Sequence, residues 1–349
     1  MSDQERTELN QLGEFALIET LTGTFGMENS STKRAVGDDA AVIQYEEGKQ
    51  TVISTDMLVE GVHFDMVYTP IKHLGYKAVM VNLSDIYAMN ACPKQITVSI
   101  AVSNRFSYQA LEELYTGIRL ACETYGVDLI GGDTTTSLSG LVISITAVGE
   151  ANVEEIVYRS GAKPGDKIFV SGDLGGAYVG LTVLEREKEV YMAAPGAQPE
   201  LKDHEYIVGR LLKPEARRDV YELLSEMGIK PSSMIDISDG LSSELMHICK
   251  HSEVGVIIEE EKVPISEQTY DQALDFSIDP INCALNGGED YELLFTVSPE
   301  QAEQLKGSPF VTEIGEVTAE GEGIKINTKG GNTHELQAQG WNHMDDEEA

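Results

Sequence analysis

The sequence predicts an α/β (α+β) protein of two domains, each of mixed sheet plus helices. Two observations lead to this prediction. The 349 residues exceed the usual size of one domain, and short runs rich in β-branched residues alternate with longer runs of helical periodicity. We place the boundary between residues 153 and 154, shortly before a turn at Pro164–Asp166. The two predicted domains therefore cover residues 1–153 and 154–349.

The first half contains four predicted strands and one clear helix. The strands are the stretches QTVISTDMLVEG, ITVSIAV, VDLIGGDTTT and LVISITAVGE. The helix spans Tyr108–Tyr125, where apolar residues recur at three- and four-residue steps. A further helix is expected over Leu74–Ala91. Its apolar stripe includes Asp85, which places a carboxylate on a buried face.

The second half continues the alternation. A strand is expected at Lys167–Ser171 and a helix in KPEARRDVYELLSEMG, followed by strands in VGVIIEE, YELLFTV and TEIGEV. The segment Tyr191–Glu205, rich in Pro, Gly and polar residues, is expected to be a loop. In MIDISDGLSSEL, Ile235 and Ile237 alternate with Asp236. That alternation predicts a strand with isoleucines in the core and carboxylates on the other face, before a turn at Gly240.

Composition restricts the classes of partner. The formal net charge is -34, from 59 acidic and 25 basic residues. Because such a surface repels polyanions, we exclude nucleic acid and anionic membranes as partners. An anionic substrate would also be repelled unless cations accompany it. The polar start MSDQERTELN is no signal peptide, and no run approaches the ~18 apolar residues of a membrane span, so a cytoplasmic protein is expected.

The cysteines and histidines give weaker signals. Because no two of the four cysteines form a CxxC pair, a zinc site is not expected, and we expect reduced, buried thiols. His247 and His251 have helical i, i+4 spacing without an HExxH motif, which favours a surface pair. His63 follows closely on Asp56, where a substrate contact is plausible.

Seven aspartates lie among apolar residues rather than in charged runs: Asp38, Asp39, Asp56, Asp85, Asp133, Asp236 and Asp239. Any one alone is most simply a cap, a turn residue or half of an ion pair. If several converge, two carboxylates about 4 Å apart repel by roughly 4 kcal/mol at an effective dielectric of 20, so the cluster needs metal ions. Oxygen ligands without Cys or His indicate a hard cation.

Magnesium fits these aspartates better than calcium. DISDG is no calcium loop, because the twelfth position from Asp236 is His247 rather than Glu. Magnesium uses few protein carboxylates together with substrate phosphates. A nucleotide that arrives with magnesium would also resolve the charge repulsion.

Three glycine turns could let the backbone approach a phosphate: GGD at Gly131–Asp133, SGDLGG at Ser171–Gly176 and NGGEDYE at Asn286–Glu292. Ordinary turns explain such glycines more often than phosphate binding does. The sequence has no GxxxxGK[ST] loop, no GxGxxG loop and no HRD…DFG set. A nucleotide would therefore be bound by another architecture.

The motifs, taken in order, resemble the thiamine-monophosphate kinase family. They are GEFALIE, VGDDAAVI, ISTDMLVEGVHF, YKAVMVNLSDIYAMNACP, LIGGDTT, RSGAKPGD, IDISDGLSSEL and GGEDYELLF, and the resemblance covers Gly13–Trp341. The wider superfamily includes aminoimidazole ribonucleotide synthetase and selenophosphate synthetase. ISTDMLVEGVHF together with GGEDYELLF favours the thiamine enzyme.

The resemblance implies an aminoimidazole ribonucleotide synthetase-like fold. Its N-terminal domain would bind ATP and Mg²⁺ and contact a second copy through its sheet, giving a homodimer. Its C-terminal domain would complete the substrate and metal site. The implied ligands are ATP, several Mg²⁺ ions and thiamine monophosphate.

The resemblance also assigns individual residues. Metal-binding positions are matched by Asp39, Ser54, Thr55, Asp56, Asp85, Asp133, Asp236 and Asp239. ATP contacts are matched by Tyr115, Gly132, Asp133, Arg159 and Ser238. Substrate positions are matched by His63, Glu289 and Trp341. Asp38 directly precedes a metal position.

The implied reaction converts ATP and thiamine monophosphate into ADP and thiamine diphosphate. The acceptor phosphate, with a second pKa of about 6, is mostly dianionic near pH 7 and needs no strong general base. We therefore expect direct in-line transfer with no catalytic acid or base from the protein. Two alternatives stay open: another ATP-dependent synthetase or kinase of the superfamily, and a non-catalytic protein that binds divalent metal.

Overall fold

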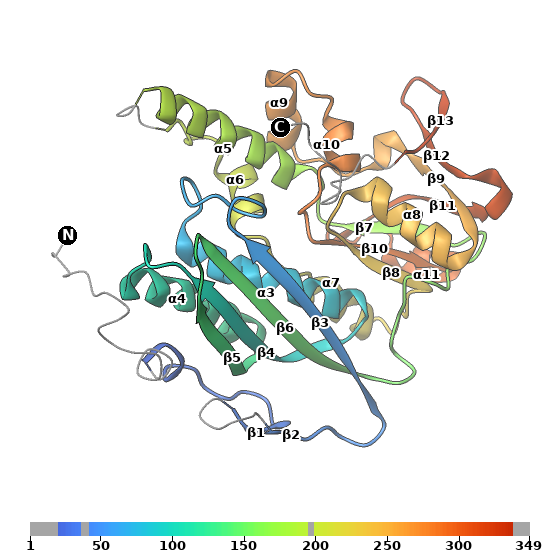
Figure 1. The fold of residues 1–349 in the computed structure, drawn as a ribbon. Coiled ribbons are helices and arrows are strands. Elements are labelled where there is room, and N and C mark those ends of the chain that lie inside the picture. Colours follow the sequence, from blue (N-terminus) through green and yellow to red (C-terminus); the bar gives the residue numbers. More distant parts are fainter. Residues whose placement is uncertain (1–19, 36–41, 195–198, 338–349) are drawn as a thin grey trace. The chain divides into compact units, whose positions relative to one another are not determined.

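The computed structural model describes residues 20–35, 42–194 and 199–337. The chain divides into two compact units (Figure 1). Unit 1 comprises the described residues up to Tyr87 together with Ala91–Ile156, and unit 2 comprises Ala88–Asn90 and the described residues from Val157 onward. Each unit has its own sheet, so each forms its own core.

Unit 1 is built on a four-stranded sheet with two helices on one face (Figure 1). The strand order is β3-β6-β4-β5; β6 pairs antiparallel with β3 and β4, whereas β4 and β5 are parallel. The bounds are β3 Lys49–Val59, α3 Ile71–Ala88, β4 Cys92–Val102, α4 Tyr108–Tyr125, β5 Asp128–Thr136 and β6 Leu141–Asn152. A short antiparallel pair, β1 (Thr32–Arg34) and β2 (Val42–Ile43), lies outside this sheet.

Helix α4 has the predicted bounds. The Ser107 side chain caps its start by accepting a hydrogen bond from the Ala110 amide at 3.3 Å, and Gly126 ends it in the left-handed conformation. Leu111, Leu114 and Ile118 are fully buried, as the periodicity predicted.

Helix α3 packs closely against α4 because two glycines face each other. A Cβ on Gly75 would lie 2.1 Å from the Leu114 carbonyl oxygen, and one on Gly117 would lie 1.9 Å from the Lys72 carbonyl oxygen. The expected helix is present, and its predicted stripe residues Leu74, Ala78, Val81 and Ala88 are buried. Every residue of Leu74–Ala88 is buried except Asp85, which is partly buried, so the helix is enclosed on nearly all sides.

Unit 2 is built on a seven-stranded sheet of order β13-β12-β9-β11-β7-β10-β8. Neighbouring strands are antiparallel, except that β12 and β9 are parallel. The bounds are β7 Lys167–Ser171, β8 Ser233–Ile237, β9 Val254–Glu259, β10 Glu292–Val297, β11 Val311–Ala319, β12 Ile324–Asn327 and β13 Thr333–Glu335. The strands predicted in this half are therefore confirmed.

Helices of unit 2 contribute to two apolar clusters with the sheet. The bounds are α5 Gly176–Ala193, α6 Glu205–Leu212, α7 Arg218–Glu226, α8 Leu241–Ser252, α9 Glu267–Asp275, α10 Pro280–Asn286 and α11 Pro299–Leu305. Ile235 and Ile237 of β8 belong to the cluster that includes α8 and α10. Met234 belongs to the other cluster, which includes α7, α11 and the stacked rings of Phe169 and Phe295. Ile235 and Ile237 thus enter one core, as the alternation predicted, whereas Met234 enters a second core that the pattern did not predict.

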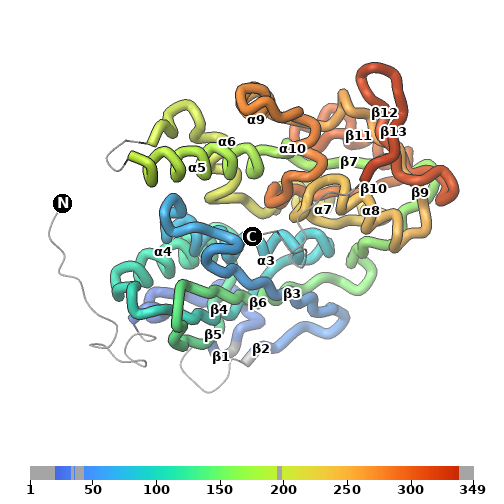
Figure 2. The backbone as a smooth tube through the Cα atoms, turned by 45° about the horizontal axis from the view of Figure 1, so that its top comes forward, coloured from blue at the N-terminus to red at the C-terminus, as the bar shows by residue number. Residues whose placement is uncertain are grey.

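Two segments of unit 2 differ from expectation. Helix α5 continues to Ala193, so the start of the expected loop Tyr191–Glu205 is helical; α6 lies beside α5 (Figure 2). Helix α7 begins at Arg218 rather than in the preceding KPEAR stretch. Arg217 directly precedes the helix, and its side chain forms ion pairs with Asp219 of α7 and with Glu292 of β10.

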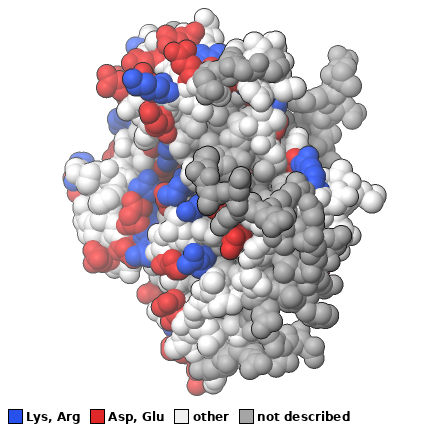
Figure 3. All heavy atoms as spheres, turned by 90° about the vertical axis from the view of Figure 1, so that its left-hand side faces the viewer, with Lys and Arg blue, Asp and Glu red and all other residues white. Residues whose placement is uncertain are grey.

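Three features of the described residues bear on the expectations drawn from composition. Within the described ranges, no helix is both long and apolar enough to cross a membrane. On the face drawn in Figure 3, Lys and Arg side chains lie among Asp and Glu side chains, so this face is mixed despite the acidic composition. Cys122, Cys249 and Cys283 are buried free thiols, while Cys92 is only partly buried.

Candidate active site

Two carboxylates of unit 1 lie together where β3 meets α3. The Ser54 hydroxyl donates a hydrogen bond to the Asp85 carboxylate, and the side chains of Asp56 and Asp85 are in hydrogen-bonding contact. The Asp56 backbone amide donates to Asn82 Oδ1 at 3.1 Å. Alternate residues of the strand therefore meet residues three apart on the helix, which brings three of the predicted metal positions together.

The electrostatics of this pair favour a bound cation. Burial and the neighbouring Asp85 carboxylate raise the pKa of Asp56 from 3.8 to about 6. Two carboxylates and a hydroxyl are the oxygen donors that a hard divalent cation prefers, so the residues fit Mg²⁺. Among the described residues, no group of three or more His, Cys, Asp or Glu side chains converges as a complete metal site.

Two other predicted metal positions of unit 1 lie apart from this pair. The Thr55 side chain donates to the Ile145 carbonyl oxygen at 3.0 Å and contacts the Thr146 hydroxyl, so it bonds within the sheet. Asp133 on β5 is in register, through β4 and β6, with Met57 on β3. With strands about 4.8 Å apart, Asp133 lies about 14 Å across the sheet from Met57.

Two predicted ATP positions lie on or next to β5, the strand that carries Asp133. Gly132 has no room for a side chain, because a Cβ would lie 1.8 Å from the Val98 carbonyl oxygen. Tyr115 of α4 is buried, its ring stands edge-on to Phe25, and its hydroxyl is hydrogen-bonded with Thr134. Burial raises the pKa of Tyr115 to about 12, so its hydroxyl stays protonated near neutral pH.

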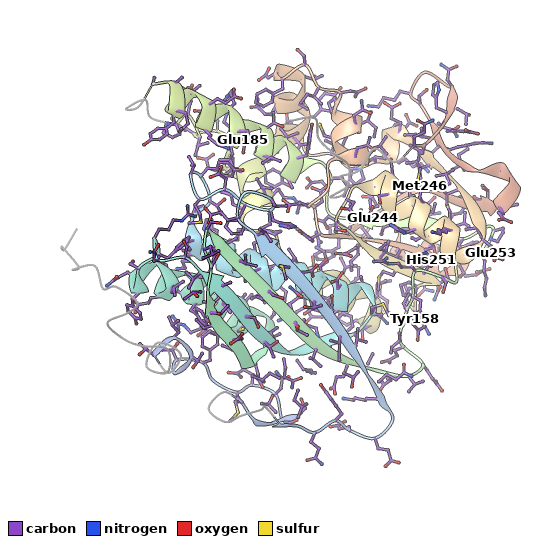
Figure 4. The ribbon with its side chains drawn as sticks, viewed as in Figure 1. Tyr158, Glu185, Glu244, Met246, His251 and Glu253 are labelled. Atoms are coloured by element: carbon purple, nitrogen blue, oxygen red, sulfur yellow. The ribbon has the colours of Figure 1, made fainter. Side chains whose placement is uncertain are left out.

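In unit 2, the end of β8 and the turn that follows it carry three predicted positions. Asp236, which is 4 % exposed, is followed by the partly buried Ser238 and Asp239. Glu244 of α8, labelled in Figure 4, holds this turn. Its Oε1 accepts hydrogen bonds from the Ser238 amide at 3.1 Å and the Asp239 amide at 2.9 Å. Gly240 has φ +107°, and a Cβ there would lie 2.7 Å from the Leu285 carbonyl oxygen, so only glycine fits.

The carboxyl group of Glu244 is buried, and its pKa is raised. Glu244 is 2 % exposed, and its Oε2 atom has no hydrogen-bond partner within the described part of the chain. Burial raises the pKa of the Glu244 carboxyl from 4.5 to about 7, partly offset by the amides of Asp239 and Ser238. The turn is therefore clamped by a carboxyl group that is costly to ionise.

The predicted substrate residue Glu289 adjoins the same turn. Its backbone amide donates to the Ser238 carbonyl oxygen at 2.7 Å, and the Tyr291 amide donates to the Ile237 carbonyl oxygen at 2.8 Å. A Cβ on Gly288 would lie 2.6 Å from the Ser238 carbonyl oxygen. The predicted substrate and metal positions of unit 2 are thus held side by side by backbone hydrogen bonds.

Two remaining predicted residues lie on loops. Exposed Arg159 belongs to a segment held by Ser252, whose hydroxyl accepts the amides of Gly161 at 3.1 Å and Ala162 at 3.2 Å. His63, in the turn after β3, accepts the Val59 amide at its Nδ1 at 3.1 Å. An acceptor at Nδ1 places the proton of a neutral ring on Nε2. Asp38, Asp39 and Trp341 lie outside the described residues.

The glycine turn Ser171–Gly176 is not an open phosphate cradle. The Asp290 carboxylate already accepts hydrogen bonds from the Gly175 amide at 2.7 Å and the Ala177 amide at 3.4 Å. The start of α5 is therefore neutralised by a side chain of the protein itself.

Sequence reasoning missed Asn82, Glu244 and Asp290. Asn82 precedes Asp85 by one helical turn, which is a usable signal for a shared face. Glu244 lies in the first turn of α8, where a carboxylate commonly binds free amides. Asp290 gives no local signal, because the amides that it binds are more than a hundred residues away.

Comparison with known proteins identifies the family. Residues 37–151 match the N-terminal domain of AIR synthase related proteins, and residues 163–326 match the C-terminal domain. The thiamine-monophosphate kinase of Aquifex aeolicus is 36% identical over 338 residues, covering 96% of this chain and 99% of the relative. That of Bacillus subtilis is 34% identical, covering 95% of this chain and 100% of the relative. The chain belongs to the thiamine-monophosphate kinase family.

Solved structures agree with membership of the thiamine-monophosphate kinase family. The enzyme from Stenotrophomonas maltophilia matches with a TM-score of 0.76 at 32% identity, covering 90% of this chain and 97% of that chain. AaThiL complexed with AMPPCP and TMP matches with a TM-score of 0.73 at 34% identity, covering 98% of this chain and 100% of that chain. The predicted family and fold class are confirmed. Hydrogenase maturation protein HypE, at 21% identity and a TM-score of 0.70, shares the fold alone.

Proposed function

We propose that this protein transfers the γ-phosphoryl group of ATP to thiamine monophosphate, which yields ADP and thiamine diphosphate. The observation that carries the proposal is the match to AaThiL, a 34% identical protein over nearly the whole chain that was solved with AMPPCP and TMP. The paired carboxylates Asp56 and Asp85 support it, because their repulsion fits a cation-assisted reaction.

The aspartates serve as metal-positioning groups rather than acids or bases. Ser54, Asp56 and Asp85 would hold Mg²⁺ in unit 1, with Asp39, Thr55 and Asp133 as further predicted ligands; Asp236 and Asp239 would contribute from unit 2. Bound Mg²⁺ supplies the positive charge that lets two phosphate groups approach each other. Asn82 and Glu244 would keep the ligands aimed by binding the backbone amides of Asp56 and Asp239.

Transfer is proposed to be direct and in-line. The acceptor phosphate, with a second pKa of about 6, is already mostly a dianion near pH 7. Arg159 adds a fixed positive charge for the ATP phosphates, while Tyr115, Gly132 and Ser238 complete the nucleotide contacts. Direct transfer predicts inversion at a chiral γ-phosphate, and retention would contradict it.

The organic part of the substrate is proposed to contact His63, Glu289 and Trp341. Thiamine carries a permanent thiazolium cation, which an acidic protein attracts. Trp341 would offer an aromatic face to this cation, an interaction of ~0.5–2 kcal/mol. Glu289 would accept a hydrogen bond from the aminopyrimidine.

The proposal also covers the roles of the two domains, a homodimer and a cytoplasmic location. Residues 1–153 would bind ATP and Mg²⁺ and form the dimer contact, and residues 154–349 would complete the site. The outer side of β3 supports a homodimer through the first sheet, because Ile53 and Met57 are 66% and 55% exposed there. A cytoplasmic location fits the substrates.

A coupled assay for ADP release tests the function. With ATP and Mg²⁺, thiamine monophosphate should stimulate ADP release, and EDTA should abolish it. Selenide or a ribotide as acceptor tests the superfamily alternative, which requires turnover with one of them and none with thiamine monophosphate. Metal-dependent melting without ATP turnover would instead indicate a metal-binding scaffold.

A further inference from the structure

The segment Gly287–Tyr291 has an unusual backbone. Gly288, Glu289 and Tyr291 have φ values of +69°, +57° and +52°. Non-glycine residues rarely adopt this left-handed region, and two of them in three positions persist only where the surroundings hold them firmly. On one side the segment is held by its hydrogen bonds to the carbonyl oxygens of Ile237 and Ser238.

Asp290 holds the segment from the other side. It is 1 % exposed, and its carboxylate accepts the amides of Gly175 at 2.7 Å and Ala177 at 3.4 Å. Its Oδ1 atom also lies 3.7 Å from Arg210 Nη2. The residue between the two strained positions is therefore anchored to the start of α5 and to a guanidinium group of α6.

The Arg210 side chain binds three different segments of unit 2. Its Nη2 group donates to the carbonyl oxygens of Asp173 at 3.0 Å and Asp290 at 3.3 Å, and its Nη1 lies 2.9 Å from Glu292 Oε1. Glu292 is in turn paired with Arg217 at 2.8 Å. The guanidinium of Arg210 thus contacts both the backbone and the side chain of Asp290.

We propose that Asp290 and Arg210 are positioning residues that fix Glu289 for the thiamine-bearing substrate and hold it in register with Asp239. This inference rests on the proposed function. An apolar pair could fill the same volume at similar or better stability, because burying two charges is costly. What an apolar pair could not supply is the set of directed hydrogen bonds that keeps the backbone at Glu289 in its left-handed conformation.

The test compares Asp290→Asn and Arg210→Lys with Arg217→Gln as a matched control. Arg217 is a partly buried arginine of the same network, but its partners are Glu292 and Asp219, not the strained segment. Asp290→Asn should raise the KM for thiamine monophosphate about tenfold, the effect of losing one charge-assisted hydrogen bond, with an unchanged KM for ATP. Arg210→Lys should raise the KM for thiamine monophosphate less than Asp290→Asn does. Arg217→Gln should lower the melting temperature without moving either KM.

Hydrogen exchange supplies a readout that needs no turnover. The amides of Glu289 and Tyr291 should exchange faster in Asp290→Asn than in wild type, and stay protected in Arg217→Gln. If Asp290→Asn does not fold, Arg210→Lys carries both measurements. Wild-type KM values and wild-type exchange in the folded variant would overturn the inference, as would an equal rise in KM in Arg217→Gln. The two proposals can fail separately. If the wild-type protein does not turn over thiamine monophosphate, but the Glu289 and Tyr291 amides exchange faster in Asp290→Asn, the proposed function is refuted and the anchoring role stands.

Discussion

Replacing Asp85 with Asn should stabilise the metal-free protein while abolishing phosphoryl transfer. Asp85 and Asp56 are like charges in contact, and Ser54 donates a hydrogen bond to Asp85. Asn keeps an oxygen that can accept the Ser54 hydrogen bond, so the substitution removes mainly the charge. Without metal, the wild-type pair costs folding free energy that the variant does not incur.

The magnitude follows from the proton affinity of Asp56. Its pKa rises from 3.8 to about 6, with burial as the larger cause and Asp85 as the second. At about 1.4 kcal/mol for each tenfold change, the whole shift corresponds to about 3 kcal/mol, of which we assign about 1 kcal/mol to Asp85. A gain of that size raises the melting temperature by about 2–4 °C in domains of 150–250 residues.

The sign depends on pH. Because the folded-state pKa of Asp56 lies above its ordinary value of 3.8, the folded state binds this proton more tightly than the unfolded chain does. The contribution of Asp56 to wild-type stability is therefore greatest below about pH 4 and falls as the pH rises to about 6. The advantage of Asp85→Asn should be full at pH 7.5 and absent near pH 4.

The assay is thermal melting in EDTA at both pH values, with ADP release measured in parallel. Glu113→Gln on the exposed side of α4 removes the same formal charge and serves as the control. An Asp85→Asn protein no more stable than Glu113→Gln at pH 7.5 would refute the repulsion argument. Normal activity of Asp85→Asn at low magnesium would refute the metal role.

Three further substitutions probe other parts of the site. Gly240→Ala should cost at least about 2 kcal/mol, because its φ of +107° and the Leu285 carbonyl oxygen exclude a Cβ; the urea midpoint checks this, and an unchanged midpoint contradicts it. Burial raises the pKa of Glu244 to about 7, so its contribution to wild-type stability should fall between about pH 4.5 and 7. Glu244→Gln should remove this contribution to the pH dependence in urea titrations in EDTA. An unaltered pH profile would show that Glu244 does not make it. Trp341→Ala should raise the KM for thiamine monophosphate several-fold with less effect on ATP, and equal KM values in the two proteins would remove Trp341 from the site.

Regular elements were predictable where a local pattern decides them. The helix Tyr108–Tyr125 and the strand Lys167–Ser171 have the predicted bounds, because periodicity, capping and turn residues all lie within the segment. The buried stripe of helix α3 was predicted, but its enclosure on nearly all sides was not, because enclosure depends on its neighbours rather than on its own sequence. The loop was expected to start at Tyr191, but α5 continues to Ala193.

The candidate site was predictable in its chemistry more than in its geometry. An excess of aspartates among apolar residues indicated a hard cation, and Asp56 and Asp85 do lie together. The same reasoning treated Asp133 as a member of the same set, but strand order places it across the sheet from β3. Strand order depends on long-range pairing, which local periodicity does not encode.

By itself, the sequence determined the two α/β halves, the acidic composition, the motif order of the thiamine-monophosphate kinase family and the residue types of the site. Only the tertiary structure decided which polar groups meet. It joined Asn82 to the Asp56 amide and clamped the turn at Asp239 with Glu244. It also buried Asp290 against amides 115 and 113 residues away. The physical reason is that a buried polar group must find its hydrogen-bond partner wherever the fold brings one, and separation along the chain does not limit that choice.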